Sequence, residues 1–325
     1  MRALLALPLA ALLLVPMVHA PAPADTAVRF VLLGDTGHGN PTQFQVASAA
    51  SSVCAARGCD LALIAGDNLY PAGPSSAYDP IFDAKFELPY RGFPAPIWLT
   101  LGNHDNGDLS GMGRGDGGQS FRGDFEVDYA HRTDRPSDLW HMPARNYTFR
   151  VGPAQFWSLD TNTLVWMGDP LGVRDPAGLE QLLWFQQSMA ASDAPWKLVF
   201  GHYPYLSNGD AGDAGIYNGV PGLGVLVKTF VEAAVCGKAD FYFAGHDHDL
   251  QWLLPGSCGA TQLLISGAGS SGDTISAPDR HPVYWQQGET PGFAWVELDE
   301  DSFTAAFYDA NANALFEQTL GKPIR

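Results

Sequence analysis

The sequence predicts an α/β fold of the αββα type, in which helices flank two packed mixed β-sheets. Strand-like apolar segments alternate with helical ones in the first third of the chain, as in a parallel sheet. Further short strand-like segments continue toward the C-terminus and suffice for a second sheet. Five apolar segments are followed at once by residues able to bind metals. Because open α/β sheets present their binding side chains just beyond the strand ends, these residues mark the expected functional edge.

The first sheet is predicted from the N-terminal part of the chain. Three segments rich in Val, Leu, Ile and Ala are expected to be its buried strands, at 28–34, 61–65 and 97–101. The segment 42–57 is predicted to be a helix, because its apolar positions recur at helical spacing and Gly58 follows its end. A short helix is expected at 78–87.

The second sheet is predicted from the rest of the chain. Its strands are expected at 146–151, 155–159, 196–200 and 241–244. A helix at 177–189 has a strongly apolar face suited to covering the sheet, and another helix is expected at 225–234. The last strand-like segments are expected to close this second sheet, at 262–266, 293–298 and 303–308.

The charge of the chain limits its partners. The 325 residues carry a formal net charge of −17 at pH 7, which argues against nonspecific nucleic-acid binding, because phosphate backbones require clustered Lys and Arg. An acidic surface also repels anions at long range, so affinity for phosphate must come from a local positive charge such as a metal ion. The expected partner is a small molecule, and the expected state is a monomer.

The N-terminus reads as a secretory signal. Arg2 precedes an apolar run that ends at Val18, and small residues of a cleavage site end at Ala20. A membrane anchor is the alternative, but the apolar run is short for a bilayer span. We therefore expect a secreted or periplasmic protein without stable membrane association, divided into a signal peptide at 1–20, a flexible N-terminus at 21–27 and one folded domain at 28–325.

Four cysteines in an exported chain indicate two disulfides. Three connectivities are possible, and the favoured one closes two short loops by joining Cys54 to Cys59 and Cys236 to Cys258. A four-thiolate zinc site is the alternative, but the second spacing is far too long for a zinc knuckle.

Five short motifs carry the candidate functional residues. They are Gly34-Asp35-Thr36-Gly37, Gly66-Asp67-Asn68-Leu69-Tyr70, Gly102-Asn103-His104-Asp105, Val199-Phe200-Gly201-His202 and Gly245-His246-Asp247-His248. Together they supply carboxylate, imidazole, phenol and amide oxygen donors, the inventory of a two-metal hydrolase. One ligand must bridge the two ions, and Asp67 is the best-placed carboxylate. A single Asp after a strand is often a cap or turn residue, but five such motifs together favour a metal site.

In this order the motifs resemble those of the purple acid phosphatases, a branch of the calcineurin-like metallophosphoesterases. Most members of that superfamily have Asp-x-His in the first motif and Gly-Asp-x-x-Asp in the second, whereas this chain has Asp35-Thr36-Gly37 and ends its second motif with Tyr70. The segment 181–185 and the lack of a plant-like N-terminal β-domain resemble the compact, tartrate-resistant acid phosphatase-like form. The resemblance implies that 28–325 is the catalytic domain.

The resemblance also implies a division of the ligands. One ion is expected on Asp35, Tyr70 and His248, the other is expected on Asn103, His202 and His246, and Asp67 is expected to bridge them. A phenolate suits Fe(III), while imidazole and amide oxygen suit a divalent ion such as Fe, Zn or Mn. The expected cofactor is therefore a dinuclear centre of Fe(III) and a divalent ion.

His104 is the candidate catalytic residue. Its place beside Asn103 would let it stabilise charge on the phosphate or protonate the leaving oxygen, with Asp105 as its possible orienting partner. A structural histidine bonded to the backbone is the alternative. His38 is ranked as a neighbour of the site or a surface residue.

These features predict an exported acid phosphatase that hydrolyses phosphate monoesters by attack of a metal-activated hydroxide. A phosphodiesterase or nucleotidase with the same centre is the alternative, and a binding protein with a degenerate site is a third hypothesis. The segment 205–224 lacks the histidine that the family often has after the fourth motif, which leaves the leaving-group acid open. The loops expected to shape the pocket are 107–118, 162–178 and 207–224, and the first of these is either a substrate lid or a surface loop without a catalytic role.

Overall fold

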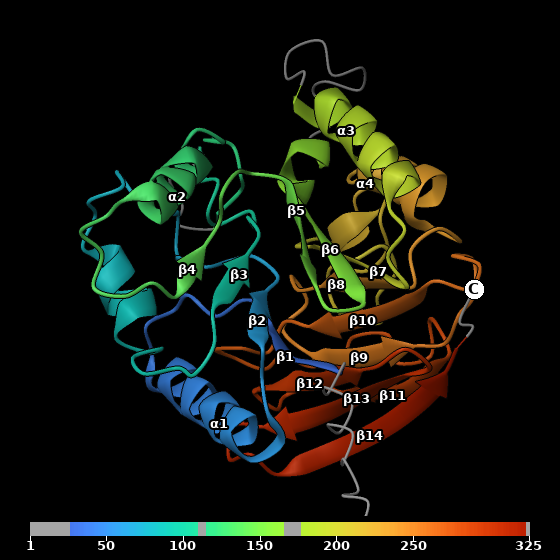
Figure 1. Cartoon of the computed structure of the whole chain (residues 1–325). Helices are drawn as coiled ribbons and strands as arrows, with labels where there is room; N and C mark the ends of the chain where they lie inside the picture. Colours follow the sequence, from blue (N-terminus) through green and yellow to red (C-terminus); the bar gives the residue numbers. More distant parts are fainter. Residues whose placement is uncertain (1–26, 110–114, 166–176, 323–325) are drawn as a thin grey trace, which may run out of the picture.

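The computed structural model describes residues 27–109, 115–165 and 177–322. Within these ranges, two seven-stranded β-sheets pack face to face and helices cover their outer faces (Figure 1). The predicted α/β sandwich is therefore confirmed. Residues 1–20 and nearly all of 21–27, predicted to be a signal peptide and a flexible N-terminus, lie outside the described residues.

The first sheet is parallel in its N-terminal half and antiparallel in its C-terminal half. Its strand order is β14-β13-β12-β1-β2-β3-β4. The strands β1 to β4 run parallel to one another, and β12, β13 and β14 continue the sheet antiparallel from β1. Their bounds are β1 Val28–Leu33, β2 Leu61–Ile64, β3 Ile97–Leu99, β4 Trp140–His141, β12 Gly292–Leu298, β13 Ser302–Asp309 and β14 Ala314–Gly321.

The second sheet has a parallel centre with antiparallel edges. Its order is β11-β9-β10-β8-β7-β6-β5, in which β6, β7, β8 and β10 are parallel. Their bounds are β5 Tyr147–Val151, β6 Ala154–Leu159, β7 Trp196–Gly201, β8 Phe241–Ala244, β9 Leu250–Leu253, β10 Gln262–Ser266 and β11 Val283–Gln287.

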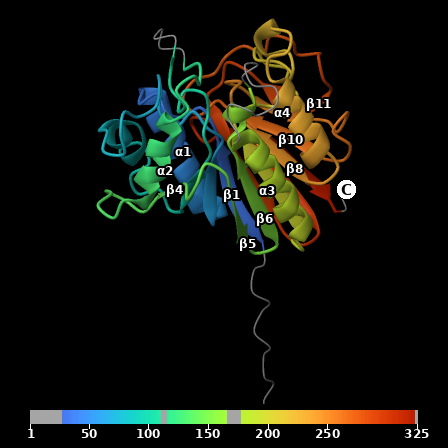
Figure 2. The same ribbon diagram turned by 90° about the horizontal axis from the view of Figure 1, so that it is seen from above.

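Helices cover the two outer faces of the sandwich (Figures 1 and 2). On the side of the first sheet lie α1 (Pro41–Arg57) and α2 (Arg122–His131), and on the side of the second lie α3 (Ala177–Ala191) and α4 (Val225–Phe230). The start of α1 follows from its sequence, since the Asn40 side chain accepts a hydrogen bond from Gln43 N and proline occupies the first turn. Short helical turns lie at Asp83–Glu87, Thr161–Leu164, Tyr217–Gly219 and Val231–Val235.

Two hydrophobic clusters hold the layers together. The larger one lies between the sheets and beneath α1, where Phe30 of the first sheet contacts Phe156 and Phe243 of the second with ring centroids 5.5 and 5.9 Å apart. The second cluster packs α3 and α4 onto the second sheet, with Phe185 and Phe230 among its buried residues. The fully buried aromatic side chains account for much of the apolar area that stabilises the sandwich.

The predicted strands lie within two residues of the observed ones, but the sheet assigned to the last two was wrong. The segments 293–298 and 303–308 belong to the first sheet, because β12 pairs antiparallel with β1, with Val31 opposite Trp295. At 78–87 the expected short helix is present in its C-terminal part, where residues 81–82 are helical and the π-helical turn Asp83–Glu87 follows. The elements α2, β4, β9, β11 and β14 were not anticipated from the sequence.

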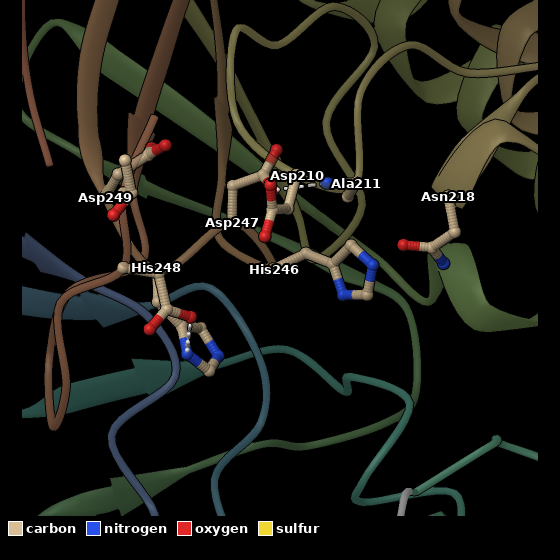
Figure 3. A pocket seen from close by; sticks show the side chains of 9 residues that line it. Asp210, Ala211, Asn218, His246, Asp247, His248 and Asp249 are labelled. Carbon is tan, nitrogen blue, oxygen red and sulfur yellow. Dashed lines mark hydrogen bonds and ion pairs between the residues drawn. The ribbon is translucent and has the colours of Figure 1, made fainter. Parts of the chain in front are cut away.

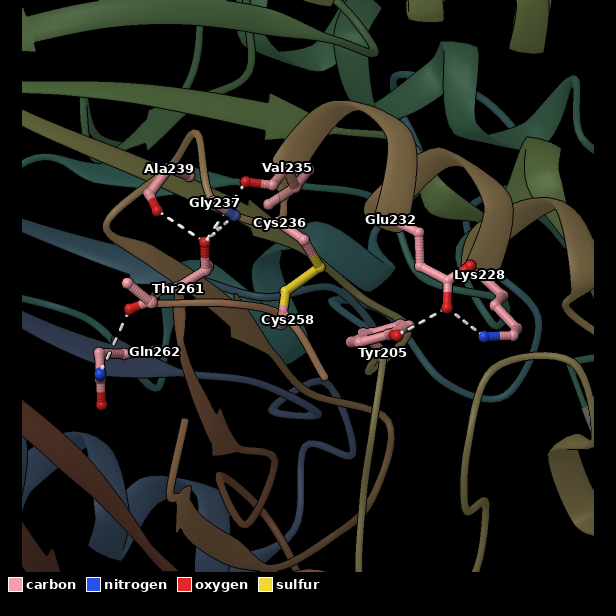
Figure 4. Close-up of a disulfide and its surroundings, with 11 residues drawn as sticks. Tyr205, Lys228, Glu232, Val235, Cys236, Gly237, Ala239, Cys258, Thr261 and Gln262 are labelled. Carbon is pink, nitrogen blue, oxygen red and sulfur yellow. Dashed lines mark hydrogen bonds and ion pairs between the residues drawn. A yellow bond between two sulfur atoms is a disulfide. The ribbon is translucent and has the colours of Figure 1, made fainter. Parts of the chain in front are cut away.

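Both favoured disulfides are present in the structure. One joins Cys54 in α1 to Cys59, and the other joins Cys236 to Cys258. Figure 4 shows the second disulfide beside Thr261, whose hydroxyl accepts from Gly237 N at 2.9 Å and donates to Ala239 O at 2.7 Å. Among the described residues, no helix has the length and apolar character to cross a membrane.

Candidate metal centre

The five motifs converge at one edge of the sandwich, where parallel strands of both sheets end. Asp35 follows β1, Asp67 follows β2 and Asn103 follows β3, while His202 follows β7 and His246 follows β8. Each strand therefore delivers a polar side chain to the same place, as the topology of parallel strands requires.

Three of these residues have unusual backbone conformations. Asp35, Asp67 and His246 have φ angles of 57°, 54° and 70°, in the left-handed region that non-glycine residues rarely adopt. Each such residue costs on the order of 1–3 kcal/mol, and residues of this kind cluster at functional sites. These backbone conformations direct the side chains of all three residues toward the same centre.

Glycine beside these residues gives the carboxylates room. A Cβ atom on Gly102 would lie 2.2 Å from Asp67 Oδ1, and one on Gly245 would lie 2.5 Å from Asp35 Oδ2. The glycines at these two positions are therefore required by the close approach of a carboxylate to the backbone.

The first set of donors consists of Asp35, Tyr70 and His248. The Tyr70 hydroxyl lies 3.2 Å from Asp35 Oδ1 and 3.1 Å from His248 Nε2, and His248 Nε2 lies 3.5 Å from Asp35 Oδ1. On the far side of the ring, His248 Nδ1 is 3.2 Å from Asp273 Oδ2 and 3.0 Å from Ser271 Oγ. Burial lowers the pKa of His248, but the hydrogen bonds to Asp273 and Asp35 raise it to about 11, which shows that this position favours positive charge.

The second set consists of Asn103, His202 and His246. His202 Nε2 lies 2.9 Å from Asn103 Oδ1 and 3.1 Å from His246 Nδ1. His202 Nδ1 lies 2.8 Å from Ala65 O, and because a carbonyl only accepts, Nδ1 carries a hydrogen and Nε2 is the nitrogen that faces Asn103 and His246. The Asn103 amide donates to Gly115 O, which leaves its oxygen facing the histidines. Converging acceptors of this kind fit a cation.

Asp67 lies between the two sets. Its Oδ2 is 3.5 Å from His202 Nε2, and its Oδ1 accepts from His104 N at 2.9 Å. Asp35, Asp67 and His202 form a buried group whose ligand atoms lie within 4.8 Å of one another. Burial alone would raise the pKa of Asp67, but the nearby histidines, His202 first, lower it to about 2. An ionised carboxylate in this position could bridge two ions.

His246 and His248 both turn toward this centre, as the sequence predicted for residues beyond the strand end. Between them, Asp247 points away and accepts from Ala211 N at 2.7 Å and from the Ser207 hydroxyl at 2.5 Å (Figure 3). Burial lowers the pKa of His246 well below its ordinary value, so its ring is neutral, the state required of a ligand.

His104 lies at the mouth of the site. Its Nδ1 is 2.6 Å from Pro71 O and therefore carries the hydrogen, while its Nε2 is 3.9 Å from Asp67 Oδ2. Together with Asp67, it lines a cavity of about 350 Å³ whose other residues include Tyr203 and Leu223. Its Nε2 can therefore meet a substrate held over the donor sets.

Asp105 does not orient His104, so that prediction was wrong. Its buried carboxylate accepts backbone hydrogen bonds from Asn68 at 2.8 Å, Leu69 at 3.0 Å and Gly102 at 2.7 Å. Burial and the charge of Asp67 raise the pKa of Asp105 to about 6. Its role is to join the loop that carries Asp67 to the loop that carries Asn103.

The buried Glu126 of α2 supports this junction and was missed from the sequence. Asn68 Nδ2 donates to Glu126 Oε2 at 3.0 Å and to Asp105 Oδ2 at 3.1 Å. Burial, followed by the charge of Asp105, raises the pKa of Glu126 well above its ordinary value of 4.5, so the carboxyl keeps its proton. Glu126 lies on the buried face of α2 with Gly123 and Tyr129, but a charged residue type gives no sequence signal that it is buried.

We expect Glu126→Gln to fold with stability equal to or above that of the wild type at neutral pH, because glutamine is neutral and keeps a donor and an acceptor. Glu126→Leu leaves Asn68 and Asp105 without this partner, which costs about 1–3 kcal/mol. Because the folded-state pKa is raised, the stabilising contribution of Glu126 is complete below the unfolded-state value of 4.5 and is lost as pH rises toward the folded-state pKa. The advantage of the Gln variant over the wild type should therefore grow with pH.

Urea unfolding of both variants and the wild type at acid and neutral pH measures this difference. A Gln variant as unstable as the Leu variant would show that Glu126 is ionised and that the assignment of its proton is wrong.

Two further residues contact the site without joining either donor set. His38 stacks on Tyr70 with ring centroids 3.8 Å apart, and its Nδ1 lies 2.7 Å from Ser270 Oγ. This agrees with its ranking as a neighbour of the site. Tyr203 packs against His246 with ring centroids 4.3 Å apart, a contact that the sequence did not suggest.

Comparisons with known proteins agree with this geometry. A family model for calcineurin-like phosphoesterases matches residues 28–250. Purple acid phosphatase 4 of Arabidopsis thaliana is 27% identical over 94% of this chain and 87% of that protein. Tartrate-resistant acid phosphatase type 5 of Homo sapiens is 28% identical over 97% of this chain and 98% of that protein.

Among solved structures, GAP50, the anchor in the inner membrane complex of Plasmodium, matches with a TM-score of 0.71 at 19% identity, over 91% of this chain and 89% of that one. At this identity the likeness shows the fold alone. The two phosphatases above are phosphoric-ester hydrolases that align over nearly the whole chain. Because the family model matches more than half of this chain, the chain belongs to the calcineurin-like phosphoesterases.

Proposed function

We propose that the protein is an exported acid phosphatase that hydrolyses phosphate monoesters at a dinuclear centre of Fe(III) and a divalent ion. The observation that carries this proposal is the pair of donor sets on either side of Asp67. One set contains a phenol and a carboxylate, which suit Fe(III), and the other contains imidazoles and an amide oxygen, which suit Fe, Zn or Mn.

In this proposal Asp35, Tyr70 and His248 hold one ion and Asn103, His202 and His246 hold the other, with Asp67 between them. When bound, two metal ions would activate a water molecule for attack on phosphorus and neutralise the phosphoryl oxygens. Ala65 O and Asp273 fix the rings of His202 and His248, so the ligand nitrogens are presented in one orientation. The strained backbone of Asp35 and Asp67 holds both carboxylates in place before any ligand binds.

The remaining groups act on the substrate. His104 fixes its Nδ1 hydrogen on Pro71 O, so its Nε2 is the atom able to hold a proton for the leaving oxygen. Val165, Tyr203 and Leu223 form an apolar wall of the cavity, suited to the organic part of a monoester and to excluding water from it.

Export is supported by the two disulfides and by the signal-like residues 1–20. We propose cleavage near Ala20, a secreted or periplasmic location, a catalytic domain at 28–325 and a monomeric state. We propose no stable nucleic-acid or membrane partner, because the net charge of −17 disfavours binding to phosphate backbones.

A phosphodiesterase is the second candidate, because a smaller cavity of about 150 Å³ lies against the same centre. Hydrolysis of p-nitrophenyl phosphate and of its bis-ester by iron- and zinc-loaded protein, from acid to neutral pH, separates the two. A large monoester preference with an acid optimum supports the phosphatase, whereas diester preference near neutral pH supports the phosphodiesterase.

Tyr70→Phe is expected to remove the visible absorption band of the iron-loaded protein, because the band arises from charge transfer between a phenolate and Fe(III). Tyr129→Phe is the matched control, since Tyr129 is a buried tyrosine that donates to Glu87 outside the centre, and this variant should keep the band. Absorption spectra and iron content per chain provide the measurement. A band that persists in Tyr70→Phe, or a wild-type protein that is colourless and fully active without iron, contradicts the assignment.

A further inference from the structure

Two cavities lie against the candidate metal centre and share part of their lining. The larger, of about 350 Å³, contains His104, Val165 and Leu223 in its lining. The smaller, of about 150 Å³, is lined by Asp210, Asp273 and Thr274 among others. The described residues that line both cavities are His246, His248 and Asn218. Because the two histidines belong to the donor sets, Asn218 is the shared lining residue that is free to act on substrate.

The backbone holds Asn218 firmly at this position. It adopts φ 54° and ψ 27°, a left-handed conformation, and its N–H donates to Ala211 O at 2.9 Å. The preceding Tyr217 is fully buried and its hydroxyl donates to Pro204 O. A rare backbone conformation anchored on both sides is typical of residues that are positioned for function.

Asn218 belongs to the lining of both cavities. Figure 3 shows its carboxamide directed toward His246 across the opening. Its side chain is exposed and forms no hydrogen bond with the described part of the chain. The carboxamide is therefore available to limit what can extend from one cavity into the other.

We propose that Asn218 is a specificity-determining residue that makes the centre selective for monoesters by separating the two cavities. This inference rests on the proposed phosphatase function. The single ester group of a monoester lies in the larger cavity, against Val165 and Leu223. A diester has a second ester group, which must extend past Asn218 into the smaller cavity while its phosphorus stays over the centre.

The charge around the smaller cavity also limits which second ester groups of a diester can enter it. The side chains of two acidic residues, Asp210 and Asp273, lie in its lining. Because like charges repel, an anionic second group is disfavoured there. A diester with a neutral second group is the substrate class that an enlarged passage would admit.

Asn218→Gly is the variant that tests this role with least disturbance. Glycine adopts positive φ without steric cost, so the backbone conformation is retained while the side chain is removed. Asn218→Asp is the matched control, because aspartate has nearly the same shape and also tolerates the left-handed region. Thermal unfolding of both variants checks that they fold.

The measurement is the ratio of kcat/KM for bis(p-nitrophenyl) phosphate to that for p-nitrophenyl phosphate. For Asn218→Gly we expect this ratio to rise about tenfold, the lower end of what filling or emptying a small pocket changes. For Asn218→Asp the ratio should stay near the wild-type value, even if charge lowers both rates.

An unchanged ratio in a folded Asn218→Gly variant of an active enzyme overturns this inference alone. An equal rise in Asn218→Asp also overturns it, because the carboxamide would then act as a hydrogen-bond donor and not as a wall. A wild-type protein that prefers the diester directly contradicts the proposed separation of the two cavities by Asn218. A wild-type protein that hydrolyses neither ester overturns the proposed function together with this inference.

Discussion

Asp67→Ala is expected to lower kcat for p-nitrophenyl phosphate by about a thousandfold or more, the scale seen when a main electrostatic group of an active site is removed. Asp67 is the carboxylate between the two donor sets, and its negative charge offsets three nearby imidazoles. Its loss removes the proposed bridge between the two donor sets. We therefore expect the variant to lose bound metal as well as activity.

Metal content per chain and kcat, measured on the same preparation, test this result. Asp193→Ala is the control, because Asp193 is an exposed carboxylate paired with Arg150 and precedes β7, at the opposite end of that strand from His202. It should keep both metal and activity. An Asp67→Ala protein that retains its metal and most of its activity would remove Asp67 from the centre.

The second large effect is expected at His104. If His104 Nε2 protonates the leaving oxygen, His104→Ala should lower kcat by about 10²–10⁴-fold for an alkyl phosphate, the usual range for a general acid. The loss should be much smaller for p-nitrophenyl phosphate, because p-nitrophenolate leaves readily without a proton. This dependence on the leaving group distinguishes an acid from a residue that only binds phosphate.

His131→Ala is the matched control, since His131 is exposed and lies 3.1 Å from Pro143 O. It should not alter either rate. An equal loss for both substrates in His104→Ala would show that His104 binds the phosphoryl group and that another residue supplies the proton. The absence of a histidine at 205–224 makes this second outcome informative about the pH profile.

The sequence predicted the place of the site because strand ends and ligand residues are local features. A buried strand such as Leu61–Ile64 is visible in composition, and the polar residue that follows it must lie at the strand's carboxyl end. The same reasoning brought together residues from two sheets, without knowledge of how the sheets pair. The structure brings the six other predicted ligand residues close to Asp67 in two groups, and their binding of metal stays a prediction.

Features that depend on long-range pairing were not predictable in this way. Nothing in the sequence of Gly292–Leu298 indicates that this strand pairs with Val28–Leu33. Strands of the second sheet are nearer to it in sequence. Asp105 lies next to His104 in sequence, yet three backbone N–H groups turn its carboxylate away from that ring. The left-handed backbone of Asn218 suits an Asn-Gly turn, but the hydrogen bond of its N–H to Ala211 O could not be read from the sequence.

The central claim is that two metal ions on the donors around Asp67 are needed for phosphomonoester hydrolysis. The most direct test is to strip the protein with a chelator and then titrate it with iron and zinc while following p-nitrophenyl phosphate hydrolysis and bound metal. The account predicts negligible activity in the stripped protein and a plateau at two ions per chain. Full activity without metal, or a plateau at a single ion, would contradict it.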